Sequence, residues 1–163
     1  MVPYKDLFVQ LAEKKIRYLV AGGMAVNFHQ VQRATVDLDL ILLLEKYNVE
    51  KFAQLMKKLG YLPRVPVNPS DLADPVQRKL WTTEKGMTVF SFYHNKNSFE
   101  TIDVFVDNPF PFDEMEKAKL SVKSFGVEIP VVGLKHLIEM KRAVGRDKDI
   151  FDISQLEKIR GSR

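Results

Sequence analysis

The chain reads Ala-Thr-Val-Asp-Leu-Asp-Leu-Ile-Leu-Leu-Leu from residue 34 to residue 44. Residues 36–44 are almost wholly apolar, which predicts a buried β-strand, and Asp37 and Asp39 interrupt it. Because side chains alternate between the two faces of a strand, both carboxylates point to the same side, about 7 Å apart at the backbone. Buried carboxylates are costly unless a cation or hydrogen bonds neutralise them, so the pair indicates a divalent metal site. Mg²⁺ bound together with phosphate oxygens suits such ligands. The alternative is a strand end at which both acids face water.

A strand, two glycines and a helix precede the acid pair. A predicted strand at residues 17–21 leads into Gly22-Gly23, and a predicted short helix follows at residues 24–29. Backbone amides bared by glycine, next to a helix N-terminus, are a common phosphate-binding arrangement. Two glycines alone more often form only a turn. Here Arg33 and Thr35 stand directly before the acids, so a phosphate cradle, a cation and an acid pair lie in one short stretch.

These residues resemble a known motif. Gly22-Gly23, a short helix and Asp37-Leu-Asp39 resemble the motif of the nucleotidyltransferase superfamily that includes DNA polymerase beta. The longer run, Ala21-Gly-Gly with Arg33-Ala-Thr-Val-Asp-Leu-Asp39, is more similar to its small bacterial and archaeal branch. That branch includes AbiEii-type toxins, minimal nucleotidyltransferases and aminoglycoside nucleotidyltransferases. The resemblance implies an α/β (α+β) fold, with a mixed β-sheet flanked by helices in one nucleotidyltransferase-like domain over residues 1–163.

The superfamily takes a third acid from a later strand beside the pair, and Asp103 is the best match. It lies in the apolar, β-branched run Glu-Thr-Ile-Asp-Val-Phe-Val at residues 100–106, which predicts a strand. Asp107 is the alternative, although Asn108-Pro109 behind it indicates a strand end or a turn. The resemblance implies that the acid pair and Asp103 are catalytic and hold one or two Mg²⁺ ions.

A second block of the chain also resembles this branch. The run Leu-Lys-His-Leu-Ile-Glu-Met-Lys-Arg-Ala-Val-Gly-Arg-Asp-Lys-Asp-Ile-Phe-Asp at residues 134–152 is similar to the C-terminal motif of AbiEii-like proteins. Its periodicity predicts a helix in which Lys141 falls in the middle of the apolar stripe. Such a lysine contacts a phosphate, turns outward to water, or pairs with Asp149 or Asp152 on the next helix, where Arg146 competes for the same acids. We favour the phosphate contact for Lys141 and a structural role for the two aspartates.

The resemblance implies metal-assisted transfer of a nucleoside monophosphate from a nucleoside triphosphate to an acceptor hydroxyl. Gly22, Gly23, Arg33, Thr35 and Lys141 are the predicted nucleotide contacts. The nucleotide stays open, as does the acceptor: a small molecule, an RNA or a protein. The alternatives are a non-catalytic nucleotide-binding module and a toxin–antitoxin component. Because the chain is short for a transferase with a separate acceptor-binding domain, we expect a second subunit or a partner protein to complete the site.

The composition is that of an ordinary globular protein, with 45% apolar and 28% charged residues. A net charge of +4 favours an anionic ligand, but no run of basic residues marks a nucleic-acid surface. The chain has no cysteine, which excludes disulfides and thiolate metal sites. No apolar stretch reaches the length of a membrane span, and the first residues lack a signal-peptide core. We therefore expect a cytoplasmic protein without membrane association.

The remaining segments predict a mixed order of helices and strands. Asn48 is the expected N-cap of a helix that follows the acid strand. Arg78, Lys79, Trp81 and Lys85 are expected to form a surface over the bound nucleotide, where Trp81 either stacks on a base or has an exposed packing role. The other predicted elements are helices at residues 4–11 and 115–118 and strands at residues 87–93, 119–125 and 128–132. The strand at residues 87–93 is expected to pair with the Asp103 strand across the turn at residues 94–99.

Overall fold

A computed structural model describes residues 3–162, which fold into one mixed sheet with helices around it. The strands are β1 (Tyr18–Ala21), β2 (Leu38–Leu42), β3 (Tyr61–Pro63), β4 (Val89–His94), β5 (Thr101–Phe105), β6 (Leu120–Ser124) and β7 (Val127–Val131). The helices are α1 (Lys5–Glu13), α2 (Gly22–Phe28), α3 (Lys46–Lys58), the 3-10 helix η1 (Pro69–Ala73), α4 (Pro75–Lys85), α5 (Phe112–Lys117), α6 (Leu134–Val144) and α7 (Asp147–Ser162).

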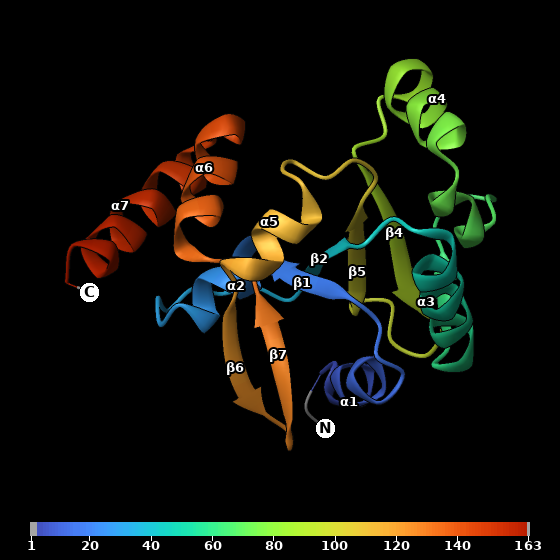
Figure 1. The fold of residues 1–163 in the computed structure, drawn as a ribbon, viewed down its shortest axis with the longest axis horizontal. Coiled ribbons are helices and arrows are strands. Elements are labelled where there is room, and N and C mark those ends of the chain that lie inside the picture. The colour runs from blue at the N-terminus through green and yellow to red at the C-terminus, as the bar shows by residue number, and fades with distance from the viewer. Residues whose placement is uncertain (1–2, 163) are drawn as a thin grey trace.

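The seven strands lie in the order β3-β4-β5-β2-β1-β7-β6. Strand β2 pairs parallel with β5, and β1 pairs parallel with β7, while the other neighbours are antiparallel. The predicted mixed α/β architecture is therefore confirmed. Helices α6 and α7 pack on each other at one end of the molecule, and α3, η1 and α4 lie at the other (Figure 1). Among residues 3–162, no helix combines the length and apolar character that crossing a bilayer requires.

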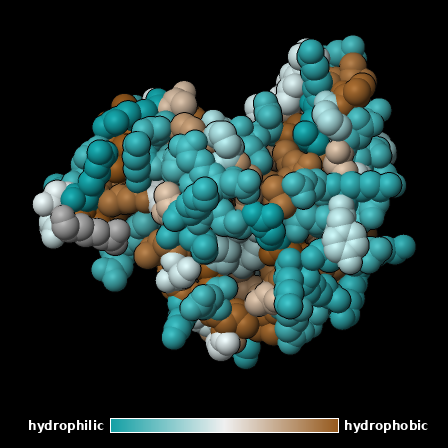
Figure 2. Space-filling view, in the orientation of Figure 1, coloured by the Kyte–Doolittle hydropathy of each residue, from teal (hydrophilic) through white to brown (hydrophobic). Residues whose placement is uncertain are grey.

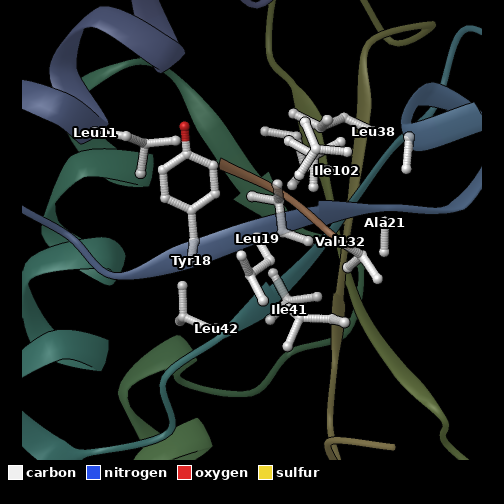
Figure 3. Close-up of a cluster of buried hydrophobic side chains, with 14 of the residues drawn as sticks. Leu11, Tyr18, Leu19, Ala21, Leu38, Ile41, Leu42, Ile102 and Val132 are labelled. Carbon is white, nitrogen blue, oxygen red and sulfur yellow. The ribbon is translucent and has the colours of Figure 1, made fainter. Parts of the chain in front are cut away.

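The apolar run around the acid pair is buried on both faces of the sheet. Strand β2 is central, between β5 and β1, and Leu38, Ile41 and Leu42 are fully buried. Figure 3 shows these side chains among Leu19 of β1 and Ile102 of β5. A strand covered on both faces has a continuous apolar sequence instead of an alternating one, which explains the run that predicted it.

The surface is hollowed between the two ends of the molecule (Figure 2). Apolar side chains show beside α4 in this view, where Val76 and Leu80 are exposed. The rest of this face is mostly hydrophilic.

The predicted capping role of Asn48 is wrong. Helix α3 begins at Lys46, and Glu45 occupies its N-cap position. The buried Asn48 side chain instead accepts a hydrogen bond from the backbone N–H of Arg17 at 2.8 Å and donates to the carbonyls of Arg17 and Leu43, at 2.9 and 3.0 Å. It thereby ties the start of β1 to the end of β2, the two strands that position the glycine turn and the acids.

Candidate active site

The strand register places Asp39 of β2 directly opposite Asp103 of β5. Neighbouring strands lie about 4.8 Å apart, so the two carboxylates start from adjacent backbone positions. Asp37 is the residue directly before β2, and it is exposed. All three predicted acids line the same cavity, of about 410 Å³. Asp107, the alternative third acid, is exposed beyond the end of β5 and does not line it.

The Gly22-Gly23 turn lies against Asp39. Gly22 has a φ of 63°, in the left-handed region that glycine adopts most easily, and a Cβ atom added there would overlap Oδ2 of Asp39. A Cβ on Gly23 would lie 3.0 Å from Oγ1 of Thr35 and 3.4 Å from Cζ of Arg33. Both glycines, Thr35 and Arg33 line the cavity with the acids. The structure therefore brings the predicted phosphate cradle and the predicted acid pair together.

Gly22→Ala is expected to destabilise the protein more than Gly23→Ala. The left-handed conformation alone costs an alanine about 1 to 2 kcal/mol, and the new Cβ must also displace the carboxylate of Asp39. Gly23→Ala adds only a tight contact with Thr35. Urea unfolding of the two variants measures the difference. Equal losses would contradict both the conformational cost at Gly22 and its overlap with Asp39.

A network of ion pairs lies beside the cavity. Nζ of the buried Lys141 is 3.0 Å from Oδ2 of Asp152 and 3.4 Å from Oδ1 of Asp149, and both acids are buried. Arg33 pairs with Asp152, and Nε of Arg146 is 2.7 Å from Oδ2 of Asp149. These contacts agree with the structural role predicted for Asp149 and Asp152. Lys141 also lines the cavity, and its phosphate contact stays a prediction.

The acids repel one another. Burial, and then the charges of Asp103 and Asp37, raise the pKa of Asp39 to about 6, although Lys141 and Arg146 act in the opposite direction. Within residues 3–162, none of the three acids forms an ion pair. Mutually repelling carboxylates without a direct cation are a donor set that a divalent ion neutralises.

The three acids alone do not form a closed metal site. In the described part of the chain, no three His, Cys, Asp or Glu side chains form a compact group that could hold a metal ion. A cation at this site would therefore rest on Asp39 and Asp103, which share one register, with Asp37 at the rim and ligand oxygens completing the shell.

The free energy of unfolding is expected to fall as the pH rises from about 4 to about 6, through the contribution of Asp39. Its pKa is about 6 in the folded protein and about 4 in an unfolded chain, so the folded state binds more protons in this window. That advantage disappears as the pH passes the folded pKa. Urea unfolding of wild type and Asp39→Asn across this range isolates the contribution. An identical pH dependence in both proteins would contradict it.

Ser91 is a site residue that the sequence analysis missed. It stands opposite Asp103 on β4, and its hydroxyl donates a hydrogen bond of 2.6 Å to Oδ1 of Asp103. Such a bond fixes the orientation of a carboxylate. The predicted pairing of this strand with the Asp103 strand is confirmed, but the sequence did not give the register that sets Ser91 opposite Asp103.

Part of the cavity lining is apolar. Its apolar residues come from α6, from the start of β4 and from the end of β5. The apolar residues that line it are Val89, Phe105, Leu137, Met140 and Val144.

The segment predicted to cover the nucleotide lies elsewhere. None of Arg78, Lys79, Trp81 and Lys85 is among the residues that line the cavity. Trp81 is buried against Phe90, with ring centres 5.6 Å apart, so its aromatic ring serves the core instead of a ligand.

No protein-family model matches this sequence, and no curated protein is similar to it in sequence. Several solved structures, in contrast, are similar to this chain in fold. The lincosamide antibiotic adenylyltransferase LnuA, bound to lincomycin, has a TM-score of 0.63 and 15% identity, over 98% of both chains. ANT(2'')-Ia, in complex with adenylyl-2''-tobramycin, has a TM-score of 0.57 and 13% identity, over 98% of this chain and 92% of its own.

A nucleotidyltransferase-like antigenic protein from Paracoccidioides brasiliensis has a TM-score of 0.59 and 15% identity, over 93% of this chain and 72% of its own. At these identities the similarity shows the fold. The resemblance predicted from the glycine turn and the acid pair is therefore confirmed at that level: the chain has the nucleotidyltransferase fold.

Proposed function

On this nucleotidyltransferase fold, we propose that the protein transfers a nucleoside monophosphate from a Mg²⁺-bound nucleoside triphosphate to an acceptor hydroxyl. One observation carries the proposal. The glycine turn and the three acids, Asp37, Asp39 and Asp103, line the same cavity, with Gly22 closely apposed to Asp39. Backbone N–H groups bind phosphate oxygens, and carboxylates bind divalent cations. A site for a Mg²⁺-bound triphosphate needs both kinds of group side by side.

The nucleotide would lie in this cavity. Its phosphates would lie along the backbone amides of Gly22-Gly23, near Arg33 and Thr35, with exposed Arg146 and Lys148 adding positive charge. Its base would pack on the apolar residues that α6, β4 and β5 contribute to the lining.

The transfer itself is a displacement at phosphorus. The acceptor oxygen forms a bond to the α-phosphorus, and the bond from that phosphorus to the oxygen of the leaving pyrophosphate breaks. The acceptor proton passes to Asp103, which Ser91 orients. Asp39 and Asp103 would hold Mg²⁺, with Asp37 at the rim, and the bound ion supplies charge neutralisation and a lowered pKa for the acceptor hydroxyl.

A nucleoside triphosphate with Mg²⁺ is expected to stabilise the protein. A ligand at 100 times its dissociation constant adds about 2.7 kcal/mol to the free energy of unfolding. Thermal unfolding with each of the four triphosphates at millimolar concentration, with Mg²⁺ or EDTA, measures this. Asp39→Asn should abolish the Mg²⁺-dependent part. Absence of stabilisation by all four would exclude the proposed function.

A non-catalytic nucleotide-binding module, alone or in a toxin–antitoxin pair, is the second candidate. The observation that favours it is the engagement of Arg33 and Lys141 with Asp152, which occupies two cations otherwise available to phosphates. Incubation with α-³²P-labelled triphosphates and a cell extract separates the two. Labelled product indicates transfer, whereas stabilisation without product indicates binding alone.

A further inference from the structure

A row of polar residues crosses the sheet at the level of the acids. Asp39 stands opposite Asp103, and Asp103 stands opposite Ser91. The backbone N–H of Arg64, the residue after β3, donates to the carbonyl of Ser91 at 2.9 Å, so Arg64 continues the row. At the other end, Asp39 pairs with Ala21, directly before the glycine turn. The row therefore runs from the phosphate cradle, over the acids, to Arg64.

The side chain of Arg64 is held in place but not neutralised. Its Nη2 donates to Oγ1 of Thr101 at 3.1 Å, and its guanidinium carbon lies 5.4 Å from the ring centre of Tyr93. It is exposed and forms no ion pair with any residue from 3 to 162. Most of its five N–H donors are free to meet a ligand. A guanidinium fixed on an aromatic ring is preorganised to bind a phosphate.

We propose that Arg64 and Tyr93 form the acceptor subsite, and that the acceptor carries a phosphate beside its reacting hydroxyl. This inference rests on the proposed function. Arg64 lies two strands from Asp103, about 10 Å at the backbone, on the side away from the glycine turn. The guanidinium itself reaches Thr101, two residues before Asp103 on β5, which suits an acceptor whose phosphate and reacting hydroxyl belong to one sugar. A sugar phosphate and the terminal nucleotide of an RNA share this chemistry.

The same geometry disfavours a polycation. An acceptor such as tobramycin, whose adenylyl derivative is bound to ANT(2'')-Ia, needs acidic partners beyond the reacting centre. In this chain the next position in the row after Ser91 is a guanidinium. A cationic acceptor would meet repulsion where a phosphate meets charge-assisted hydrogen bonds.

Titration of the arginine side chain tests the subsite directly. The ¹⁵N–¹H signal of Arg64 Nε, assigned by its loss in Arg64→Gln, is followed during addition of ribose 5-phosphate, ribose, a 5′-phosphorylated triribonucleotide or tobramycin. The signal is expected to shift with the two phosphorylated probes and not with ribose or tobramycin. A larger shift with the triribonucleotide than with ribose 5-phosphate assigns the subsite to an RNA end, and the reverse assigns it to a small sugar phosphate. Absence of a shift with both phosphates, or a shift with tobramycin, overturns the proposal.

A second measurement separates this subsite from the nucleotide site. Arg64→Gln is expected to weaken binding of the better phosphorylated probe by about 10- to 100-fold, while the affinity for Mg²⁺–triphosphate stays unchanged. Arg160→Gln, at an exposed arginine of α7, is the matched control and should change neither. Equal weakening of triphosphate binding in Arg64→Gln would place Arg64 in the nucleotide site and overturn the inference.

The two proposals fail in different ways, because the arginine titration needs neither triphosphate nor turnover. A shift at Arg64 in a protein that no triphosphate stabilises overturns the proposed function alone. Stabilisation by a triphosphate without any shift at Arg64 overturns the acceptor subsite alone.

Discussion

Replacing Asp39 or Asp103 by asparagine is expected to reduce nucleotide transfer by a factor on the order of 10² to 10³ or more, whereas Asp107→Asn should leave it intact. The first two acids stand opposite each other on β2 and β5 and line the cavity. In the proposed mechanism each loss removes a cation ligand, and Asp103→Asn also removes the proton acceptor. Asp107 is exposed and outside the cavity. Transfer of label from an α-³²P triphosphate measures all three variants.

Loss of activity through misfolding is distinguished by stability in the absence of ligand. Asp39→Asn should unfold at the same urea concentration as wild type or a higher one, because it removes one of three repelling carboxylates. An inactive Asp107→Asn with an active Asp103→Asn would exchange the roles of the two residues. Full activity in Asp39→Asn would remove the acid pair from the mechanism.

The glycine turn and the acid pair were predictable because their chemistry is local. Alternation along the predicted strand put Asp37 and Asp39 on one side, and both line the cavity although β2 begins only at Leu38. Asp103 was also predictable, since an acid inside an apolar, β-branched run stands out. The hairpin between β4 and β5 was also predicted and is confirmed, but the exact length of its turn sets the register, so Ser91 could not be placed opposite Asp103. Arg64 joins the row through the pairing of β3 with β4, which the sequence did not predict.

The wrong predictions share a physical cause. Asn48 has a high preference for N-caps, and Trp81 has a face suited to stacking on a base, but tertiary contacts outweigh such local preferences. Asn48 gains three hydrogen bonds to the backbone of Arg17 and Leu43, and Trp81 gains burial against Phe90. These contacts depend on how Arg17, 31 residues before Asn48, and the strand that carries Phe90 are placed in space, so neither gain could be weighed from local preferences.

For Lys141, too, the sequence showed the local pattern but not the tertiary contact. Its place in the apolar stripe of α6 left three possibilities, which were a phosphate contact, an outward turn to water, or a pair with Asp149 or Asp152, and burial of the side chain excludes the second. The sequence could not decide between these acids and a phosphate, since that depends on how α7 folds back on α6. The structure shows both acids as its partners.

Lys141→Met is expected to lower the free energy of unfolding by about 3 kcal/mol, at the low end of the range of about 3 to 5 kcal/mol for breaking a buried ion pair. Methionine keeps the apolar stem but leaves Asp149 and Asp152 without their shared cation. The loss stays at the low end because Arg33 still contacts Asp152 and Arg146 still contacts Asp149. Urea unfolding without ligand measures it.

Arg142→Met is the matched control, since Arg142 lies next to Lys141 on α6 and its pair with Glu157, at 2.9 Å, is exposed. Its loss should be about 0 to 1 kcal/mol. In Lys141→Met, Asp152→Asn should then recover part of the stability, because it neutralises an acid that has lost a partner.

Nucleotide binding decides the second role of Lys141. If it also contacts a phosphate, Lys141→Met weakens triphosphate binding by about 1.5 to 3 kcal/mol. A large loss of stability with unchanged triphosphate affinity would make Lys141 a structural residue alone, and would leave Arg146 and Lys148 as the cations that face the phosphates.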